Sequence, residues 1–145
     1  MRAVRFPYLK YKGALCPLVM VAIQGPKDWA GILAYVDSGA SYSILSTKVA
    51  EEVGLAYEDG QLQYVTVGDG SAIPLYLHRL PIRIGSYEFT ATIGFSPRLG
   101  IGFNLLGRQD IFGHFDVTFS DTRGVVVFQP VRSLLPIRQR ARGTR

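Results

Sequence analysis

Cysteine and histidine are scarce in this chain. Its 145 residues include one cysteine, Cys16, and two histidines, His78 and His114. A single cysteine cannot form an internal disulfide, so the sequence gives no sign of an oxidising compartment. We expect Cys16, which lies in an apolar stretch, to be a small core residue. Neither histidine has another histidine, a cysteine or a carboxylate at ligand spacing, so no metal site and no metal cofactor are expected.

A long apolar run is also missing. The segment Ala14–Ile23 is interrupted by Pro17 and is too short to cross a membrane. Basic residues precede it, as they do in a signal peptide, but no small-residue cleavage site follows. Gln24-Gly25-Pro26 is typical of a turn instead. We therefore predict a buried strand at Leu18–Ile23 and favour a cytoplasmic location.

Acidic residues are absent from the C-terminal end. The formal net charge of +5 is concentrated in the two ends of the chain, which carry Arg2, Arg5, Lys10 and Lys12 on one side and Arg132, Arg138, Arg140, Arg142 and Arg145 on the other. A basic end of this kind can contact nucleic acid or an anionic membrane. However, no aromatic residue is interleaved with the arginines for base stacking. We therefore expect residues 130–145 to be a solvated, flexible tail.

Short apolar segments separated by turn residues fill the rest of the chain. We predict strands at Leu18–Ile23, Trp29–Val36, Leu62–Val67, Ser71–Leu77, Leu80–Ile84, Tyr87–Ile93, Phe103–Arg108, Asp116–Phe119 and Val125–Phe128. One helix is predicted at residues 46–53, with Ser46 as N-cap and Gly54 as the stop, and a second short helical segment at Gln109–Phe115. This pattern predicts an all-β fold, a closed or nearly closed barrel or sandwich with one or two short helices.

Asp37 is the candidate for chemistry. It directly follows the apolar run Ile32–Val36 and is followed by Ser38 and Gly39, which indicates a buried strand that delivers a carboxylate into a tight turn. A carboxylate held near backbone N–H groups is a candidate acid or base. One carboxylate cannot be both at once, and the chain contains no second Asp-Thr/Ser-Gly. An enzyme of this kind therefore needs a carboxylate from elsewhere.

The residues around Asp37 resemble the active-site motif of retropepsin-like aspartic proteases. Ala34–Ser41 is similar to the family's Asp-Thr/Ser-Gly-Ala turn after an apolar strand. Asn104-Leu105-Leu106-Gly107-Arg108, with Gly107 seventy positions after Asp37 (107 − 37), resembles the second signature. Gly68-Asp69-Gly70 lies between them, where the family places its flap, and the pair Ile44-Leu45 also fits. The resemblance covers roughly residues 17–128 and implies a closed, single-lobed aspartic protease β-barrel.

The resemblance implies an endopeptidase that works as a homodimer without a cofactor. The same aspartate from each chain would meet its mate on a two-fold axis. Two carboxylates about 4 Å apart repel by ~4 kcal/mol at an effective dielectric of ~20, so they would share one proton. The ionised one would activate water, and the protonated one would donate to the carbonyl of a bound peptide or protein substrate. The alternative is a catalytically silent peptide-binding or dimerisation module of the same fold.

The remaining roles carry over residue by residue. Ser38 would hydrogen-bond across the dimer, Gly39 would let the backbone approach the carboxylate, and Gly107 would pack behind the turn. The residues that would contact substrate, from the turn and the flap, are Ala40, Gly68, Asp69, Gly70 and Ser71. Two departures stand out: Tyr35 is bulkier than the usual aliphatic residue, and Ser41 replaces an acid that pairs with the arginine at Arg108.

These expectations divide the chain into three parts. Residues 1–13 form an N-terminal extension that is available as a strand for the dimer interface. Residues 14–129 form the retropepsin-like domain, and residues 130–145 form the basic tail.

Overall fold

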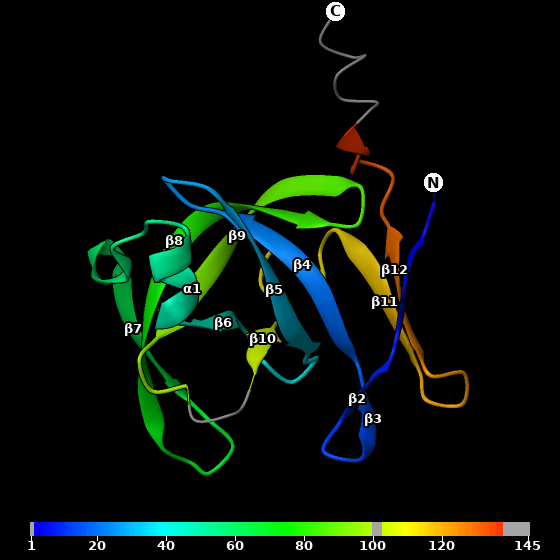
Figure 1. Cartoon of the computed structure of the whole chain (residues 1–145), viewed down its shortest axis with the longest axis horizontal. Helices are drawn as coiled ribbons and strands as arrows, with labels where there is room; N and C mark the ends of the chain where they lie inside the picture. The colour runs from blue at the N-terminus through cyan, green and yellow to red at the C-terminus, as the bar shows by residue number, and fades with distance from the viewer. Residues whose placement is uncertain (1, 100–102, 138–145) are drawn as a thin grey trace, which may run out of the picture.

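The computed structural model describes residues 2–99 and 103–137, and within them the chain is mostly β-strand, as predicted (Figure 1). The strands in chain order are β1 (Val4–Pro7), β2 (Leu9–Tyr11), β3 (Ala14–Cys16), β4 (Leu18–Gln24), β5 (Trp29–Val36), β6 (Ser43–Ser46), β7 (Gln61–Thr66), β8 (Ala72–Ile84), β9 (Tyr87–Ser96), β10 (Asn104–Leu106), β11 (Phe115–Ser120) and β12 (Val125–Pro130). Helix α1 spans Thr47–Glu52, and a single 3₁₀ turn spans Tyr57–Asp59.

Six of these strands form a closed ring. The large sheet has the order β4-β5-β10-β6-β9-β8-β7, and β4 also pairs with β8, so the sheet closes on itself and leaves β7 as an appended edge strand. Ala22 lies opposite Arg83 and Ile23 opposite Ile82 at this closure. Closure removes the free edges of the ring strands, which otherwise invite pairing with other chains. The predicted barrel is therefore present, and β5 is one of its strands, paired with a neighbour on each side.

Apolar side chains from opposite walls fill the barrel. Ile23, Ile82 and Ile84 are completely buried, as are Phe95 and, from α1, Ala50. The strands alternate between buried and exposed residues, which is the period of a sheet with one face turned to a core. Helix α1 ends in a Schellman motif: the N–H groups of Leu55 and Gly54 donate to the carbonyls of Ala50 and Glu51.

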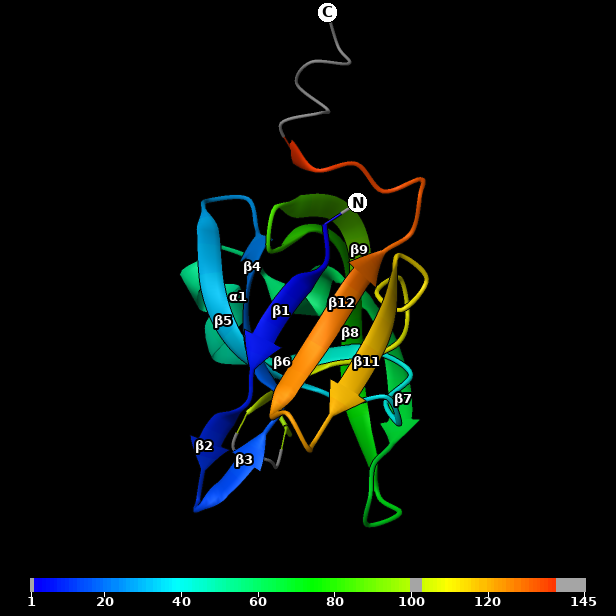
Figure 2. The same ribbon diagram turned by 90° about the vertical axis from the view of Figure 1, so that its right-hand side faces the viewer.

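A separate three-stranded sheet, ordered β1-β12-β11, packs beside the barrel (Figure 2). Val126 and Phe128 of β12 are completely buried, and Phe115 contacts Phe128 with 5.5 Å between ring centroids. The N-terminal residues thus take part in the fold, since β1 pairs with β12 of its own chain. The three-part division of the chain stays a prediction. Of the predicted tail, Leu134 is buried, and residues 138–145 lie outside the described residues.

Three local predictions are wrong, and a fourth, the N-cap at Ser46, is confirmed in its position but not in its hydrogen bond. Ser71–Leu77 and Leu80–Ile84 belong to one strand, β8, which continues through His78 and Arg79. Gln109–Phe115 forms consecutive turns rather than a helix, because Asp110 has φ of +62°, in the left-handed region. Ser46 does precede α1, but its hydroxyl makes no capping hydrogen bond. Cys16 is half-buried, and its thiol lies 3.7 Å from the Ala14 carbonyl.

Within the described residues, no helix is long and apolar enough to cross a membrane. The cytoplasmic location stays a prediction.

Candidate active site

Asp37 sits at the end of a central strand of the barrel. Strand β5 pairs with β4 on one side and, in parallel, with β10 on the other. Its last residue, Val36, is buried, and the N–H of Asp37 donates to the carbonyl of Leu106 (3.0 Å). The backbone then turns, because the N–H of Ala40 donates to the Asp37 carbonyl (3.2 Å). Asp37 is therefore delivered, half-buried, to the edge of the barrel by two paired strands.

The turn itself holds the carboxylate. The N–H of Gly39 donates to Oδ1 of Asp37 across 2.9 Å. A Cβ at position 39 would lie 3.2 Å from that oxygen, closer than ordinary side-chain contacts. Glycine thus allows the backbone to approach the carboxylate. The second carboxylate oxygen keeps its capacity to bind water or a substrate group, and the structure gives it no protein donor among the described residues.

Gly107 lies directly behind this turn. A Cβ on Gly107 would collide with the carbonyl group of Tyr42 and would come within 2.9 Å of the Ala40 carbonyl oxygen. The N–H of Gly107 donates to the buried hydroxyl of Ser43 (3.0 Å). The next amide, that of Arg108, donates to the Ala40 carbonyl (2.9 Å). The two predicted signatures are therefore joined backbone to backbone, and only glycine fits at the point of closest approach.

The side chain of Arg108 is held without an acidic partner. Its Nη1 donates to the backbone carbonyl of Ser38 (3.0 Å), and its guanidinium lies 5.0 Å from the centroid of the Phe112 ring. Ser41, which stands where the family carries an acid, is exposed, and Arg108 forms no ion pair within the described part of the chain. The arginine thus contacts the Asp37 turn through a carbonyl group rather than a carboxylate.

Sequence reasoning missed Asn104 as a positioning residue. Its side-chain carbonyl accepts the N–H of Ser46 (2.9 Å), and its side-chain amide donates to the Leu33 carbonyl (3.2 Å). Asn104 therefore ties β10 to β6 and to β5, the strand that carries Asp37. The only signal in the sequence is a polar residue at the start of an otherwise apolar strand.

A cleft of about 1050 Å³ opens between the Asp37 turn and the β7–β8 hairpin. Of the predicted site residues, those that line it are Asp37, Gly39, Ala40, Gly68, Asp69 and Ser71. The far side of the cleft carries apolar side chains, including Val65, Val67 and Ile73. The structure thus brings the turn and the predicted flap, more than thirty positions apart in sequence, to opposite walls of one cleft.

The flap hairpin is stabilised from within its own turn. The N–H of Val67 donates to the Ser71 carbonyl, and that of Gly70, with φ of +85°, donates to the Val67 carbonyl. Oδ1 of Asp69 accepts both the N–H (2.9 Å) and the hydroxyl of Ser71. These hydrogen bonds from Ser71 lower the pKa of Asp69 below its usual value. Asp69 therefore stabilises the turn at the flap tip through its hydrogen bonds with Ser71.

An aromatic stack forms the wall of the cleft next to Asp37. The rings of Tyr35 and Phe103 are stacked (5.1 Å between centroids, 14° between planes), and Tyr11 meets Phe103 edge-on at 5.2 Å. Burial, together with the nearby Cys16 and Asp37, raises the pKa of Tyr35. Only Tyr35 was singled out in the sequence. Its partners come from β2 and from the residue before β10, so their meeting requires the fold.

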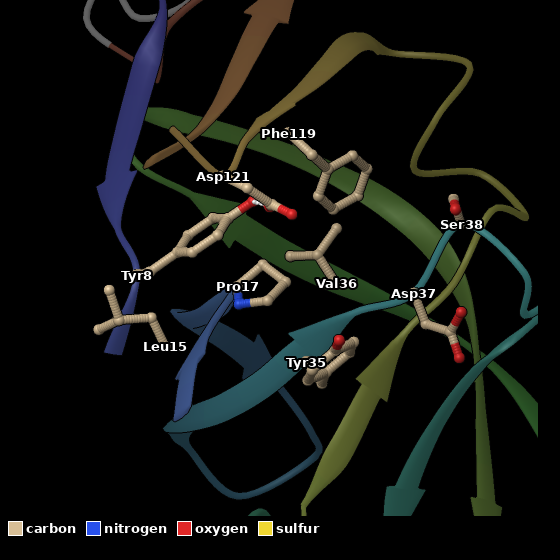
Figure 3. Close-up of a pocket in the computed structure, with 9 residues that line it drawn as sticks. All are labelled: Tyr8, Leu15, Pro17, Tyr35, Val36, Asp37, Ser38, Phe119 and Asp121. Carbon is tan, nitrogen blue, oxygen red and sulfur yellow. Dashed lines mark hydrogen bonds between the residues drawn. The ribbon is translucent and has the colours of Figure 1, made fainter. Parts of the chain in front are cut away.

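A second concavity, of about 520 Å³, lies on the other side of Asp37 (Figure 3). Its walls include Leu15, Pro17, Ser38 and Phe119, and we call it the hairpin groove because Leu15 belongs to the β2–β3 hairpin. Tyr8 donates its hydroxyl hydrogen to Oδ1 of Asp121 at the far end of this groove (2.8 Å). Burial and the adjacent Asp121 raise the pKa of Tyr8 to about 12.

No group of three or more His, Cys, Asp or Glu side chains is placed to hold a metal ion in residues 2–99 and 103–137. The side chains around the site include carboxylates, hydroxyls, aromatic rings and one arginine, Arg98, with Asp37 at the junction of the cleft and the hairpin groove. A carboxylate placed beside a cleft can accept or donate a proton.

Comparison with known families places these features in context. The sequence model of a family described as aspartyl protease matches residues 19–107, which include the Asp37 turn, the flap hairpin and Gly107. No curated protein matches the sequence.

Solved structures share the fold. A retropepsin-like aspartic protease from Rickettsia conorii matches with a TM-score of 0.60 and 17% identity, over 88% of this chain and 91% of that chain. EIAV protease, solved in complex with the inhibitor HBY-793, matches with a TM-score of 0.51 and 20% identity, over 72% of this chain and 92% of that chain. At these identities the likeness concerns the fold.

Proposed function

Because the chain belongs to the aspartyl protease family and has the retropepsin-like fold, we propose that it is a homodimeric endopeptidase whose catalytic residue is Asp37. The observation that carries the proposal is the position of Asp37. It lies at the end of β5, inside a cleft that is bounded on its other side by the flap hairpin. A binding module has no need of a carboxylate held there by a backbone N–H.

The second carboxylate comes from the partner chain. Residues 2–99 and 103–137 contain no other carboxylate in the cleft except Asp69, which is engaged with Ser71 in the flap turn. Asp37 and its mate, brought close on a two-fold axis, repel each other when both are ionised and therefore hold one proton between them. This arrangement gives one base and one acid from a single gene product.

The chemical steps follow from that shared proton. A water molecule bound between the two carboxylates loses a proton to the ionised one and attacks the carbonyl carbon of the scissile peptide bond. The protonated carboxyl donates its proton to the carbonyl oxygen, which gives a neutral tetrahedral intermediate. The carboxyl group that took the water proton then donates it to the leaving nitrogen, while the other carboxylate takes a proton from one hydroxyl group of the intermediate. The C–N bond breaks to give a carboxylic acid and an amine, and the two carboxylates again share one proton. No metal, cofactor or covalent intermediate takes part.

The cleft suits an extended peptide. It lies between the Asp37 turn and the flap, and β7, as the edge strand of the sheet, has N–H and C=O groups on its outer side for β-type hydrogen bonds. Tyr35, Phe103 and Leu105 offer apolar contact to side chains next to the scissile bond. Closure of the flap excludes water from the reacting groups.

Peptide cleavage by Asp37→Asn is the decisive test. Loss of the acid–base pair lowers the rate by ~10²–10⁴, while the isosteric amide keeps the fold and the dimer. Asp59→Asn is the matched control, because Asp59 is exposed in the 3₁₀ turn and lies outside the cleft. The substrate is a peptide library, with activity measured at several protein concentrations.

The alternative function predicts a different outcome. If the wild-type chain dimerises and binds peptides but neither it nor Asp37→Asn cleaves them, the chain is a catalytically silent binding module. Cleavage that survives Asp37→Asn at the wild-type rate contradicts the assigned role of Asp37.

A further inference from the structure

We propose that Arg98 makes the cleft selective for peptides with an acidic side chain, through an ion pair between its guanidinium group and an aspartate or glutamate of the substrate. This inference rests on the proposed function, because it concerns the peptide that occupies the same cleft. It adds the substrate class: an extended and mostly apolar segment that carries a carboxylate at a defined position.

The wall of the cleft contains a single positive charge. Among the described residues that line the cleft, only Arg98 carries one. Apolar and aromatic side chains make up most of the remaining wall, including Val65, Ile73 and Leu105. Binding sites of this composition hold apolar groups by contact and use a few polar groups to fix the identity and orientation of the ligand. Arg98 is such a polar group.

Arg98 has no acidic partner in its own chain. Neither of the two ion pairs in residues 2–99 and 103–137 involves it. Asp69, the acid of the flap, directs its Oδ1 to the N–H and hydroxyl of Ser71 instead. Arg108, by contrast, is held by the carbonyl of Ser38. The guanidinium group of Arg98 therefore has its N–H donors available for a ligand in the cleft.

The barrel fixes the backbone from which Arg98 extends. Arg98 follows β9 by two residues, and its N–H donates to the hydroxyl of Ser96 (3.2 Å), the last residue of that strand. Ser96 is buried and lies opposite Ser46 in the pairing of β9 with β6. Pro97, between Ser96 and Arg98, restricts its own φ to about −65°. The base of the arginine is thus positioned before a ligand binds, which reduces the conformational entropy lost on binding.

A side-chain carboxylate is the ligand that matches this group. The planar guanidinium forms two parallel N–H···O bonds with a carboxylate, and such bonds are stronger than those between neutral groups. A bound peptide and a closed flap shield the pair from water, which strengthens it further. A lysine or arginine of the peptide at the same position would meet a like charge and would be rejected. Arg98 therefore discriminates by attraction and by repulsion.

Two-fold symmetry extends this preference to both sides of the scissile bond. In the proposed homodimer each chain contributes its own Arg98, and the axis places the two arginines in opposite halves of the joined cleft. A peptide that spans both halves therefore passes one guanidinium group before the scissile bond and one after it. We expect an acidic residue to be favoured at one position on each side.

The test uses pairs of peptides that differ only by Glu or Gln at one position, with each position of a cleaved sequence substituted in turn. At the positions that meet Arg98, we expect the wild type to have a kcat/KM about tenfold higher for the Glu peptide. Arg98→Gln should bring this ratio to about one and leave kcat/KM for the Gln peptide unchanged. Arg98→Glu should prefer Lys to Glu at the same positions, and Arg98→Lys, which keeps the charge but not the planar fork, should retain part of the preference.

Arg132→Gln is the matched control. It also removes one exposed arginine, but Arg132 lies outside the cleft, so its preference for Glu should equal that of the wild type. Thermal unfolding of each variant checks the fold, which should not change because Arg98 is exposed as well.

Two results with an active wild type overturn this inference and leave the proposed function standing. One is cleavage without a preference for Glu at any position. The other is an equal loss of activity on Glu and Gln peptides in Arg98→Gln, which would show that Arg98 acts on the flap or on the dimer rather than on the charge of the substrate.

Binding of the same peptides, measured by fluorescence anisotropy, separates the two proposals if the wild type cleaves nothing. A preference for Glu in binding that Arg98→Gln abolishes supports the inference and contradicts the proposed function. Equal binding of Glu and Gln peptides, or no binding of either, overturns both.

Discussion

At the scale of single residues, the tightest constraint in the site is Gly107. We expect Gly107→Ala to lower the free energy of unfolding by about 1–3 kcal/mol, because its methyl group forces the Tyr42 carbonyl away. The same displacement moves the Asp37 turn, so cleavage should fall as well. Gly113→Ala is the control: nothing lies within 4 Å of its Cβ and its φ is not in the left-handed region. Urea unfolding measures both, and equal stabilities for the two variants contradict the close approach.

Asp110 links stability to pH. Burial alone would raise the pKa of Asp110, but hydrogen bonds from Thr92 and the charge of Arg79 outweigh it and lower that pKa. A carboxylate whose pKa is lower in the folded state than in the unfolded state stabilises the fold at pH values above its unfolded-state pKa. This stabilisation is lost as the pH falls through the folded-state pKa. We expect Asp110→Asn to cost about 1 kcal/mol at pH 7, since asparagine tolerates the positive φ but loses the charge.

That cost should shrink as the carboxylate of the wild type becomes protonated. Unfolding in urea at pH 7 and at about pH 3 measures the difference in stability between wild type and Asp110→Asn, which should be smaller at the lower pH. Asp116→Asn, on an exposed residue of β11, serves as control. A difference that stays constant across this range rules out the charge of Asp110 as its source.

At the scale of elements, local patterns predict most strands but not where they continue or stop. Trp29–Val36 is predicted to the residue, because its apolar alternation ends at a carboxylate and a glycine turn. Strand β8 was divided at His78 and Arg79 because polar residues interrupt its pattern. In the fold His78 Nε2 bonds the Tyr57 carbonyl (2.7 Å) and Arg79 bonds Asp110. The polar pair is thus accommodated by partners that are distant in sequence.

The same reason explains the false helix at Gln109–Phe115. Its apolar spacing allows a helical turn, but Thr92 and Arg79 hold the side chain of Asp110 and stabilise a backbone conformation that ends it. The candidate site likewise combines residues that local sequence predicts with contacts that depend on the fold. Asp37 and Gly39 lie in one short motif and Gly107 lies in a second, so each can be found from its own neighbours in the sequence. The stack of Tyr11 and Phe103 on Tyr35 instead joins three segments that only the fold brings together.

Removal of the Asp69 carboxylate, which stabilises the flap turn, should weaken the proposed catalysis. Asp69→Ala leaves the N–H and hydroxyl of Ser71 without their acceptor, so the closed flap is less well defined. We expect kcat/KM to fall about fivefold, mainly through a higher KM. Global stability should not change, because the flap tip is exposed.

Ser71→Ala provides a graded control for the flap. It removes the hydroxyl and keeps the N–H bond to Asp69, so its effect on kcat/KM should be smaller than that of Asp69→Ala. Steady-state kinetics with one peptide substrate distinguishes the variants. An Asp69→Ala enzyme with wild-type KM would contradict the proposal that this carboxylate stabilises the flap for substrate binding.

At the scale of the whole molecule, the barrel and the small sheet contribute to different parts of the candidate site. The closed ring holds β5 and β10, which carry the two halves of the site. Strand β11 of the small sheet and the β2–β3 hairpin, in contrast, supply Phe119 and Leu15 to the walls of the hairpin groove beside Asp37. Half of the proposed catalytic pair thus lies on the closed barrel, and under that proposal completion of the pair depends on protein concentration.

A subunit-mixing experiment tests this dependence directly. If each active site needs Asp37 from both chains, a heterodimer of wild type and Asp37→Asn has one carboxylate and cleaves at least about a hundredfold more slowly. Random pairing of equal amounts then leaves a quarter of all dimers fully wild type, so adding one equivalent of Asp37→Asn should reduce the activity to about half of that of the wild type alone. The partners must be equilibrated below the dimer dissociation constant and then concentrated, so that subunits exchange. Adding Asp59→Asn instead should not inhibit, since its dimers retain both catalytic carboxylates. Activity that is unaffected by excess Asp37→Asn, in samples whose mixed dimers are confirmed by native mass spectrometry, contradicts a site shared between two chains.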